Sequence, residues 1–347
     1  MLSLTTHTSY RLNIFGFPNA AGLPSDEQNV GLLDQRLGLE WIRTNIENFG
    51  GDPDLITLYG ESAGAVGVDL YNYAYPDDPI VSGLIMASGT ALAPSASYDP
   101  SHTNFTFVAN HFGCGHSGPQ AEVDCLRKIS STSIISFLEE YSNSDASPAL
   151  GFLPIFDERT RFANFTARAL AGNFTRRPAI IGTTINEGNA FVLPYDRKNG
   201  PNSLVADWYT LNIFLCPAVK TTQDRYAARA PTFRYLYGGN FSNISPQWWE
   251  GAFHASELPL VFGTTYLAKG PSTPFQTEVA ERIQDLWLAF ARDPVGGLPQ
   301  RGWNAYTPQG NAVLLGKDGK VVQPIAETRF ASVCDGAAGK PGQRPPP

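Results

Sequence analysis

Charged residues are scarce in this 347-residue chain, and basic residues are scarcer than acidic ones. Asp, Glu, Lys and Arg make up 16% of the sequence, and the net charge is −7. The deficit of basic residues argues against binding to nucleic acid or to anionic membranes, which requires a positive surface. With 42% hydrophobic residues, the chain can also bury enough apolar surface to fold, which excludes a disordered protein.

Long apolar runs are missing as well. No segment approaches the roughly 18 consecutive apolar residues that span a bilayer, so we expect no transmembrane segment. Residues 1–6 lack the basic and apolar regions of a signal peptide. On these grounds the chain reads as a globular protein without a secretion leader in this sequence.

Cysteine is limited to four residues, an even number that suits disulfides. The sequence also has five Asn-x-Ser/Thr triplets, which are acceptor sites for N-glycosylation. Together these features favour a secreted, extracellular glycoprotein, although unpaired buried thiols with unused triplets remain an alternative. The cysteines are Cys114, Cys125, Cys216 and Cys334, and the triplets begin at Asn104, Asn164, Asn173, Asn240 and Asn243.

A group of histidines and cysteines between residues 102 and 125 raises the alternative of a metal site. The spacing of these residues matches no zinc pattern, so we expect no metal and no other cofactor. The group comprises His102, His111, Cys114, His116 and Cys125.

Apolar, β-prone runs alternate with helical patterns along the chain, which predicts a mostly parallel sheet with helices on both faces. The expected strands are residues 10–17, 55–59, 83–87, 178–182 and 233–237, and helices are expected at 30–47 and 278–292. In the first helix we expect an apolar stripe of Leu33, Leu37 and Trp41, widened by Leu39, Ile42 and Ile46. We expect one domain over residues 1–335 with a helical insertion at about 92–177, and a disordered tail at 336–347.

A Gly-x-Ser-x-Gly motif, Gly60 to Gly64, lies between the predicted strand 55–59 and a helical stretch. This context is typical of a nucleophile elbow, in which a strained turn lifts the serine hydroxyl clear of the sheet. We predict Ser62 as the nucleophile. Side chains at Gly60 and Gly64 are expected to clash in the tight turn, and the amide of Ala63 is expected to face the oxygen of a bound carbonyl.

A serine nucleophile needs a base, and the sequence offers five histidines. Only His254 follows a late strand, which gives the chain order serine, acid, histidine. The acid is expected on a loop after a strand, where it holds the imidazole in one tautomer. Glu187 meets this condition, but Asp157 and Glu158 compete with it on sequence grounds alone.

Several segments, in order, resemble the type B carboxylesterase/lipase family that also contains the cholinesterases. Gly60-Glu61-Ser62-Ala63-Gly64-Ala65 is similar to its nucleophile signature, and Asn186-Glu187-Gly188 to its acid turn. His254-Ala255-Ser256-Glu257-Leu258-Pro259 is similar to its histidine segment. The similarity runs from about Tyr10 to Cys334 and also covers Asn29 to Arg36 and Asn45 to Pro53.

The resemblance implies an α/β-hydrolase fold and a Ser62–Glu187–His254 triad. It further implies that Ser88 hydrogen-bonds the acid, that Glu61 is a buried carboxylate beside the site, and that Cys114 pairs with Cys125. Cys216 with Cys334 is then the remaining pair.

The chain departs from the family pattern before Tyr10. The family has further strands there, and a Gly-Gly-Gly loop that supplies additional oxyanion donors, so the resemblance implies an N-terminally truncated copy of an active esterase. Ala63 then remains as donor, and losing one such donor lowers the rate on the order of 10²–10³-fold. The strand at 55–59 is expected to have an unpaired edge in the interior.

We expect hydrolysis of a small-molecule or lipid carboxylic ester through an acyl-enzyme. The alternatives are an inactive or truncated family member, and a non-catalytic, cholinesterase-like binding protein. Neither the particular ester nor the oligomeric state can be read from these residues.

Overall fold

The computed structural model describes residues 4–94, 99–115, 118–193 and 195–346. The chain forms two compact units. Unit 1 comprises residues 1–4, 43–94 and 164–347, and unit 2 comprises residues 5–42 and 95–163. Of the helical insertion expected at about 92–177, residues 95–163 pack with residues 5–42, and residues from 164 on belong to unit 1.

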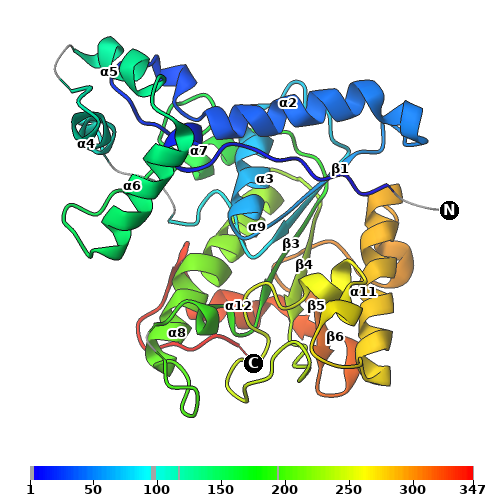
Figure 1. Cartoon of the computed structure of the whole chain (residues 1–347). Helices are drawn as coiled ribbons and strands as arrows, with labels where there is room; N and C mark the ends of the chain where they lie inside the picture. Colours follow the sequence, from blue (N-terminus) through cyan, green and yellow to red (C-terminus); the bar gives the residue numbers. More distant parts are fainter. Residues whose placement is uncertain (1–3, 95–98, 116–117, 194, 347) are drawn as a thin grey trace. The chain divides into compact units, whose positions relative to one another are not determined.

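Unit 1 is built on a six-stranded sheet in the order β1-β2-β3-β4-β5-β6, with β6 antiparallel to β5 and the other pairs parallel. The fold class is therefore α/β, as predicted (Figure 1). The elements of this unit are η2 (Ile46–Phe49), β1 (Thr57–Glu61), α3 (Ala63–Ala74), β2 (Gly83–Ala87), α7 (Phe165–Leu170), β3 (Ala179–Thr184), η3 (Glu187–Ala190), α8 (Ser203–Tyr209), the π-helix η4 (Thr210–Leu215), α9 (Cys216–Ala227), β4 (Thr232–Tyr237), α10 (Leu258–Val261), η5 (Thr265–Leu267), α11 (Pro274–Arg292), η6 (Pro299–Arg301), β5 (Asn311–Lys317), β6 (Lys320–Ala326), α12 (Glu327–Val333), β7 (Cys334–Asp335) and β8 (Ala338–Gly339).

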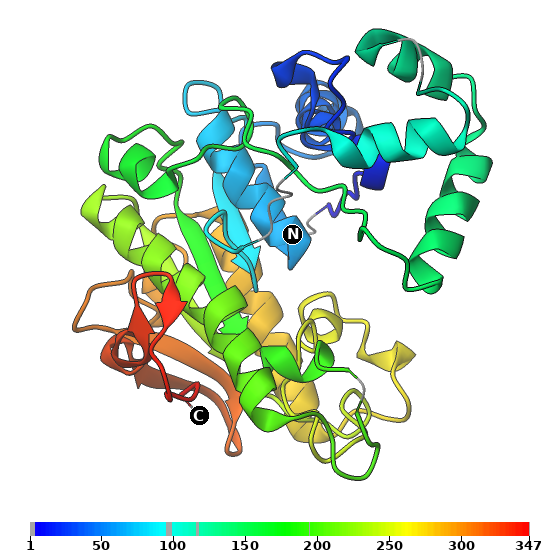
Figure 2. The same ribbon diagram turned by 90° about the vertical axis from the view of Figure 1, so that its left-hand side faces the viewer.

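Helices cover both faces of this sheet, with α11 on one side and α3 and α9 on the other (Figures 1 and 2). Successive side chains of β4 point to opposite faces of the sheet. Phe233 and Tyr235 therefore pack with α11 on one face, whereas Leu236 packs with α9 and α12 on the other. The helix α11 begins at a Thr273 cap, whose Oγ1 accepts a hydrogen bond from Gln276 N at 3.1 Å. Its apolar face then meets the sheet, as the sequence predicts.

The strand β1 forms one edge of the sheet. Of its residues only Gly60 is buried, and the others are half-buried. The expected unpaired edge is therefore present among the described residues, but it does not lie in the interior. None of the described helices is long and apolar enough to cross a membrane.

Unit 2 is helical. Its core joins Ile14 and Ala20 to Phe105, Val108 and other residues of the segment 99–152. The side chain of Asn29 also links residues 5–42 to the later segment of this unit, because it donates a hydrogen bond to Ile155 O at 2.8 Å and accepts one from Ile155 N at 2.9 Å. Its elements are α1 (Asn13–Gly16), η1 (Ser25–Glu27), most of α2 (Val30–Asn45), α4 (Thr103–His111), α5 (Pro119–Leu126) and α6 (Ser131–Asn143).

Two local predictions for the N-terminal region are wrong. Residues 10–17 form no strand, because Asn13 adopts φ 54° and its Oδ1 accepts a hydrogen bond from Ile14 N, which starts α1 instead. The helix at 30–47 is present as α2 and η2, and Leu39, Ile42 and Ile46 are buried as predicted, but Leu37 and Trp41 of the predicted stripe are not. Leu37 and Trp41 are 64% and 55% exposed, and Leu32, Leu39 and Ile42 are buried.

The sequence predicts a disordered tail at residues 336–347, and within this range Ala338–Gly339 form the short strand β8. β7 pairs with β8, and Gly339 N donates to Asn212 Oδ1 at 3.0 Å. The disulfide Cys216–Cys334 joins the start of α9 to β7. Through the bond of Gly339 to Asn212, β8 lies beside η4.

Both predicted cysteine pairs form disulfides, Cys114–Cys125 in unit 2 and Cys216–Cys334 in unit 1. The first closes a sequence separation of 11 residues and the second one of 118. A longer closed loop restricts the unfolded chain more strongly.

We therefore expect replacement of Cys216 and Cys334 by serine to lower the free energy of unfolding by about 5 kcal/mol, against about 3 kcal/mol for Cys114 and Cys125. Urea denaturation of the two double variants measures both values. A larger loss for Cys114→Ser/Cys125→Ser would contradict the ranking.

Candidate active site

Ser62 lies in a sharp turn between β1 and α3. Its backbone has φ 56° and ψ −122°, a strained combination for a residue with a side chain. At Gly60 a Cβ would lie 2.2 Å from the carbonyl oxygen of Gly64, so only glycine fits there. A Cβ at Gly64 would meet no atom within 4 Å, so the clash predicted at Gly64 is wrong. The turn presents a half-buried Ser62 at the carboxyl end of β1.

The amide nitrogens around Ser62 differ in their availability. Ser62 N donates to Ala87 O at 2.9 Å and is therefore occupied. Ala63 is the first residue of α3, is exposed, and no side chain caps this helix. The first amides of a helix have no partner within it and carry partial positive charge. Ala63 N is thus placed to donate to a carbonyl oxygen beside Ser62.

Glu187 follows β3 as the first residue of η3 and is completely buried. Its Oε1 accepts hydrogen bonds from Ser88 Oγ at 2.5 Å and from Thr184 N at 2.7 Å. Ser88 follows β2, the strand next to β3, so parallel neighbours deliver both side chains to the same end of the sheet. The two donors fix the carboxylate and leave Oε2 for a further partner.

His254 supplies that partner, since its Nδ1 lies 2.6 Å from Glu187 Oε2. Two neighbouring connections bring the residues together: Asn186 N donates to Ala252 O at 2.9 Å, and Ala252 N donates to Asn186 Oδ1 at 3.1 Å. The sequence analysis gave Asn186 no role, although it directly precedes the acid. Phe191 and Phe214 contact the imidazole, with ring centroids 4.9 and 4.7 Å away.

The other imidazole nitrogen faces a carboxylate. His254 Nε2 lies 3.0 Å from Glu61 Oε1. In the described part of the chain Ser62 Oγ makes no hydrogen bond with His254. Ser62, Glu61 and His254 nevertheless belong to one unit and meet at the carboxyl end of the sheet. Glu187 thus fixes one side of the imidazole by a hydrogen bond, and the Glu61 carboxylate lies close to the other side without forming one.

Burial and mutual repulsion shift the acids of this cluster. Burial raises the pKa of Glu61 to about 7; the charge of His254 opposes this rise, and the charge of Glu187 adds a smaller one. Burial and the charge of Glu187 raise the pKa of Glu257 to about 8. Glu257 is 1% exposed, and Tyr235 Oη donates to its Oε1 at 3.5 Å. The sequence analysis quoted Glu257 beside His254 without giving it a role.

The pKa of the His254 imidazole is shifted by the same groups. Burial opposes the charged ring of His254, but the hydrogen bond and charge of Glu187 and the charges of Glu61 and Glu257 outweigh this effect. The pKa of His254 is therefore raised above its usual value.

The competing candidates have other surroundings. Asp157, in unit 2, accepts hydrogen bonds from the amides of Arg159, Thr160 and Arg161, and Glu158 accepts one from Ala163 N. These acids close a local turn and contact no histidine in the described residues.

Two other histidines, both in unit 2, have partners of their own. His102 Nδ1 lies 3.0 Å from Asn19 Oδ1, and His111 stacks on Phe137 at 3.7 Å. His116 falls outside the described residues. In the ranges that the structure covers, no group of three His, Cys, Asp or Glu side chains could hold a metal ion.

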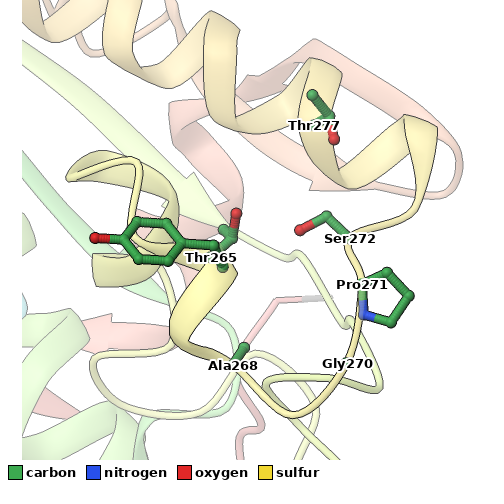
Figure 3. A pocket seen from close by; sticks show the side chains of 7 residues that line it. Thr265, Ala268, Gly270, Pro271, Ser272 and Thr277 are labelled. Atoms are coloured by element: carbon green, nitrogen blue, oxygen red, sulfur yellow. The ribbon is translucent and has the colours of Figure 1, made fainter.

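A hollow of 490 Å³ lies on the surface between η5 and the start of α11 (Figure 3). Its polar side chains include the hydroxyls of Thr265, Ser272 and Thr277, and no acid or histidine lines it. The hollow therefore offers no acid–base chemistry and is separate from the Ser62 cluster.

The model of the carboxylesterase family matches residues 6–212 and 196–332. The chain belongs to the carboxylesterase family. Its similarity to the cholinesterase branch, expected from the motifs, is also present: the chain is 26% identical to an acetylcholinesterase of Bungarus fasciatus, over 93% of this chain and 62% of that protein.

Two fungal members of the carboxylesterase family are more similar. The chain is 43% identical to Secreted lipase 5 of Gibberella zeae, over 95% of this chain and 65% of the relative. It is 42% identical to a chlorogenic acid esterase of Aspergillus niger, over 94% of this chain and 65% of the relative. The chain thus spans about two thirds of the length of these relatives.

Proposed function

We propose that the chain hydrolyses carboxylic esters through an acyl-enzyme formed on Ser62. The observation that carries this proposal is the 2.6 Å contact between Glu187 Oε2 and His254 Nδ1 at the sheet end where the strained turn presents Ser62. A buried carboxylate, an oriented imidazole and a serine at such a turn are the parts that serine hydrolysis requires. The names of the two fungal relatives support an ester substrate.

In this mechanism His254 Nε2 turns from Glu61 to Ser62 Oγ and takes its proton as Oγ attacks the carbonyl carbon. Ala63 N–H donates to the developing oxyanion. His254 then returns the proton to the leaving alcohol, and a water molecule repeats the sequence to release the acid. Glu187 holds the tautomer with the proton on Nδ1 and stabilises the imidazolium.

Hydrolysis of a chromogenic short-chain ester tests the proposal. We expect turnover that saturates with substrate. A chain that folds cooperatively but hydrolyses neither short- nor long-chain esters would contradict it. That result would favour an inactive family member, which the contact of His254 Nε2 with Glu61 instead of Ser62 makes the second candidate.

Glu61 is expected to shape the pH dependence. The base works only when His254 is neutral, so activity is lost as the pH falls through the raised pKa of His254. Glu61→Gln removes one of the charges that raise this pKa. The acid limb of kcat/KM is therefore expected to move to lower pH, by about one pH unit.

The measurement is kcat/KM against pH for wild type, Glu61→Gln and Glu139→Gln, which changes an exposed acid on α6. Glu139→Gln should leave the midpoint of the acid limb unchanged. If the midpoint of the acid limb in Glu61→Gln is unchanged or higher than in wild type, this role of Glu61 is rejected.

We further propose an extracellular location. Two disulfides persist in oxidising compartments, and one relative is named a secreted lipase. Finding the protein, with both disulfides intact, in the medium of the cells that produce it would support this location, and finding it reduced in the cytosol would contradict it.

A further inference from the structure

The five Asn-x-Ser/Thr triplets differ in how the structure holds their asparagines. N-glycosylation attaches a sugar to Asn Nδ2, so in the folded protein this nitrogen has to reach solvent. Three of the asparagines are exposed, and two are half-buried. The exposed ones are Asn164, Asn173 and Asn240, and the half-buried ones are Asn104 and Asn243.

Asn173 and Asn240 have free side chains. Neither makes a side-chain hydrogen bond in the described part of the chain, and each is followed by a buried phenylalanine. Phe174 is 2% exposed and Phe241 is 7% exposed. The phenylalanine anchors the segment while the asparagine faces solvent, so a glycan would displace nothing.

Asn164 is exposed but has a structural role as the cap of α7. Its Oδ1 accepts a hydrogen bond from Ala167 N at 2.9 Å. Glycosylation replaces one hydrogen on Nδ2 and leaves the amide oxygen intact. The cap and a glycan are therefore compatible at this residue.

Asn104 and Asn243 are held differently. Asn104 Nδ2 donates to Gly151 O at 3.0 Å, and Thr106 Oγ1 of the same triplet donates to Glu122 Oε2 at 2.9 Å. Asn243 Nδ2 lies 3.5 Å from Gly270 O, and Ser245 is buried at 4% exposure. A sugar on Asn104 Nδ2 would compete with the hydrogen bond to Gly151 O, and one on Asn243 Nδ2 with the contact to Gly270 O.

We propose that Asn164, Asn173 and Asn240 carry N-linked glycans and that Asn104 and Asn243 remain unmodified. The donor class is an oligosaccharide linked to a lipid diphosphate. The Asn amide nitrogen bonds to the anomeric carbon and loses one proton, the bond from that carbon to the phosphate oxygen breaks, and the lipid diphosphate leaves. This assignment does not depend on the proposed esterase activity.

The test uses the protein secreted by a eukaryotic host. An amidase that releases N-glycans, applied in ¹⁸O-labelled water, converts each glycosylated Asn to ¹⁸O-Asp, which peptide mass spectrometry locates. We expect label at Asn164, Asn173 and Asn240 and none at Asn104 or Asn243.

Matched variants add a second readout. Asn173→Gln and Asn240→Gln should each lower the mass of the intact protein by one glycan, whereas Asn243→Gln should leave the glycan mass unchanged. Absence of label at any of the three exposed asparagines, or label at either half-buried one, overturns the assignment.

Discussion

Replacing Ser62 by alanine is expected to lower kcat for ester hydrolysis about 10⁶-fold, because without Oγ no acyl-enzyme forms. Ser62 is half-buried in its turn and makes no side-chain hydrogen bond in the described residues. The substitution should therefore leave the fold intact. Initial rates with a chromogenic short-chain ester, together with the unfolding midpoint in urea, measure both effects.

Ser136→Ala is the matched control, since Ser136 is an exposed serine of α6 in unit 2. It should retain wild-type kcat. Ester turnover that survives in Ser62→Ala would show that another group is the nucleophile.

Replacing Glu187 by glutamine is the second large change, with an expected loss in kcat of about 10⁴-fold. An amide at this position can donate to Nδ1, which reverses the tautomer and leaves no hydrogen on Nδ1 to orient the ring. The amide also removes the negative charge that raises the pKa of His254. kcat measured at pH 8 and above separates the tautomer effect from the change in titration.

Glu158→Gln controls for the other acid that the sequence left open. Glu158 is exposed and contacts Ala163 N rather than a histidine, so its kcat should stay at the wild-type value. A loss of kcat in Glu158→Gln together with wild-type kcat in Glu187→Gln would show that Glu158, not Glu187, is the acid.

The turn at Ser62 and the place of His254 after a late strand could be expected from the sequence, because local chemistry and chain order restrict both. A glycine-flanked serine between a strand and a helix has few structural interpretations. Sequence alone could not separate Glu187 from Asp157 and Glu158. The separation required the parallel pairing of β2 and β3, which brings Ser88 to the carboxylate.

Predictions that depended on packing were less successful. Periodicity correctly located α2, but it could not tell which apolar residues face the core, because Leu37 and Trp41 extend the same pattern. The run 10–17 has the composition of a strand, yet a side chain to backbone hydrogen bond at Asn13 overrides it. These outcomes depend on contacts with residues far away in sequence or on a single local bond.

The hairpin of β5 and β6 has a signal in the sequence that could have predicted it. Asp318-Gly319 separates β5 from β6, and both residues have positive φ. An Asp-Gly pair between β-prone runs is a strong hairpin signal. The contact of His254 with Glu61 had no such signal, because it depends on the turn at Ser62 and on the connection before α10.

The most direct test of the account is covalent labelling by an aryl phosphonate ester, an analogue of the tetrahedral intermediate. Peptide mapping of the labelled protein locates the adduct. The account predicts one phosphonyl group on Ser62, formed in wild type and much more slowly in Glu187→Gln. An adduct on another residue, or none in a sample that hydrolyses esters, would contradict it.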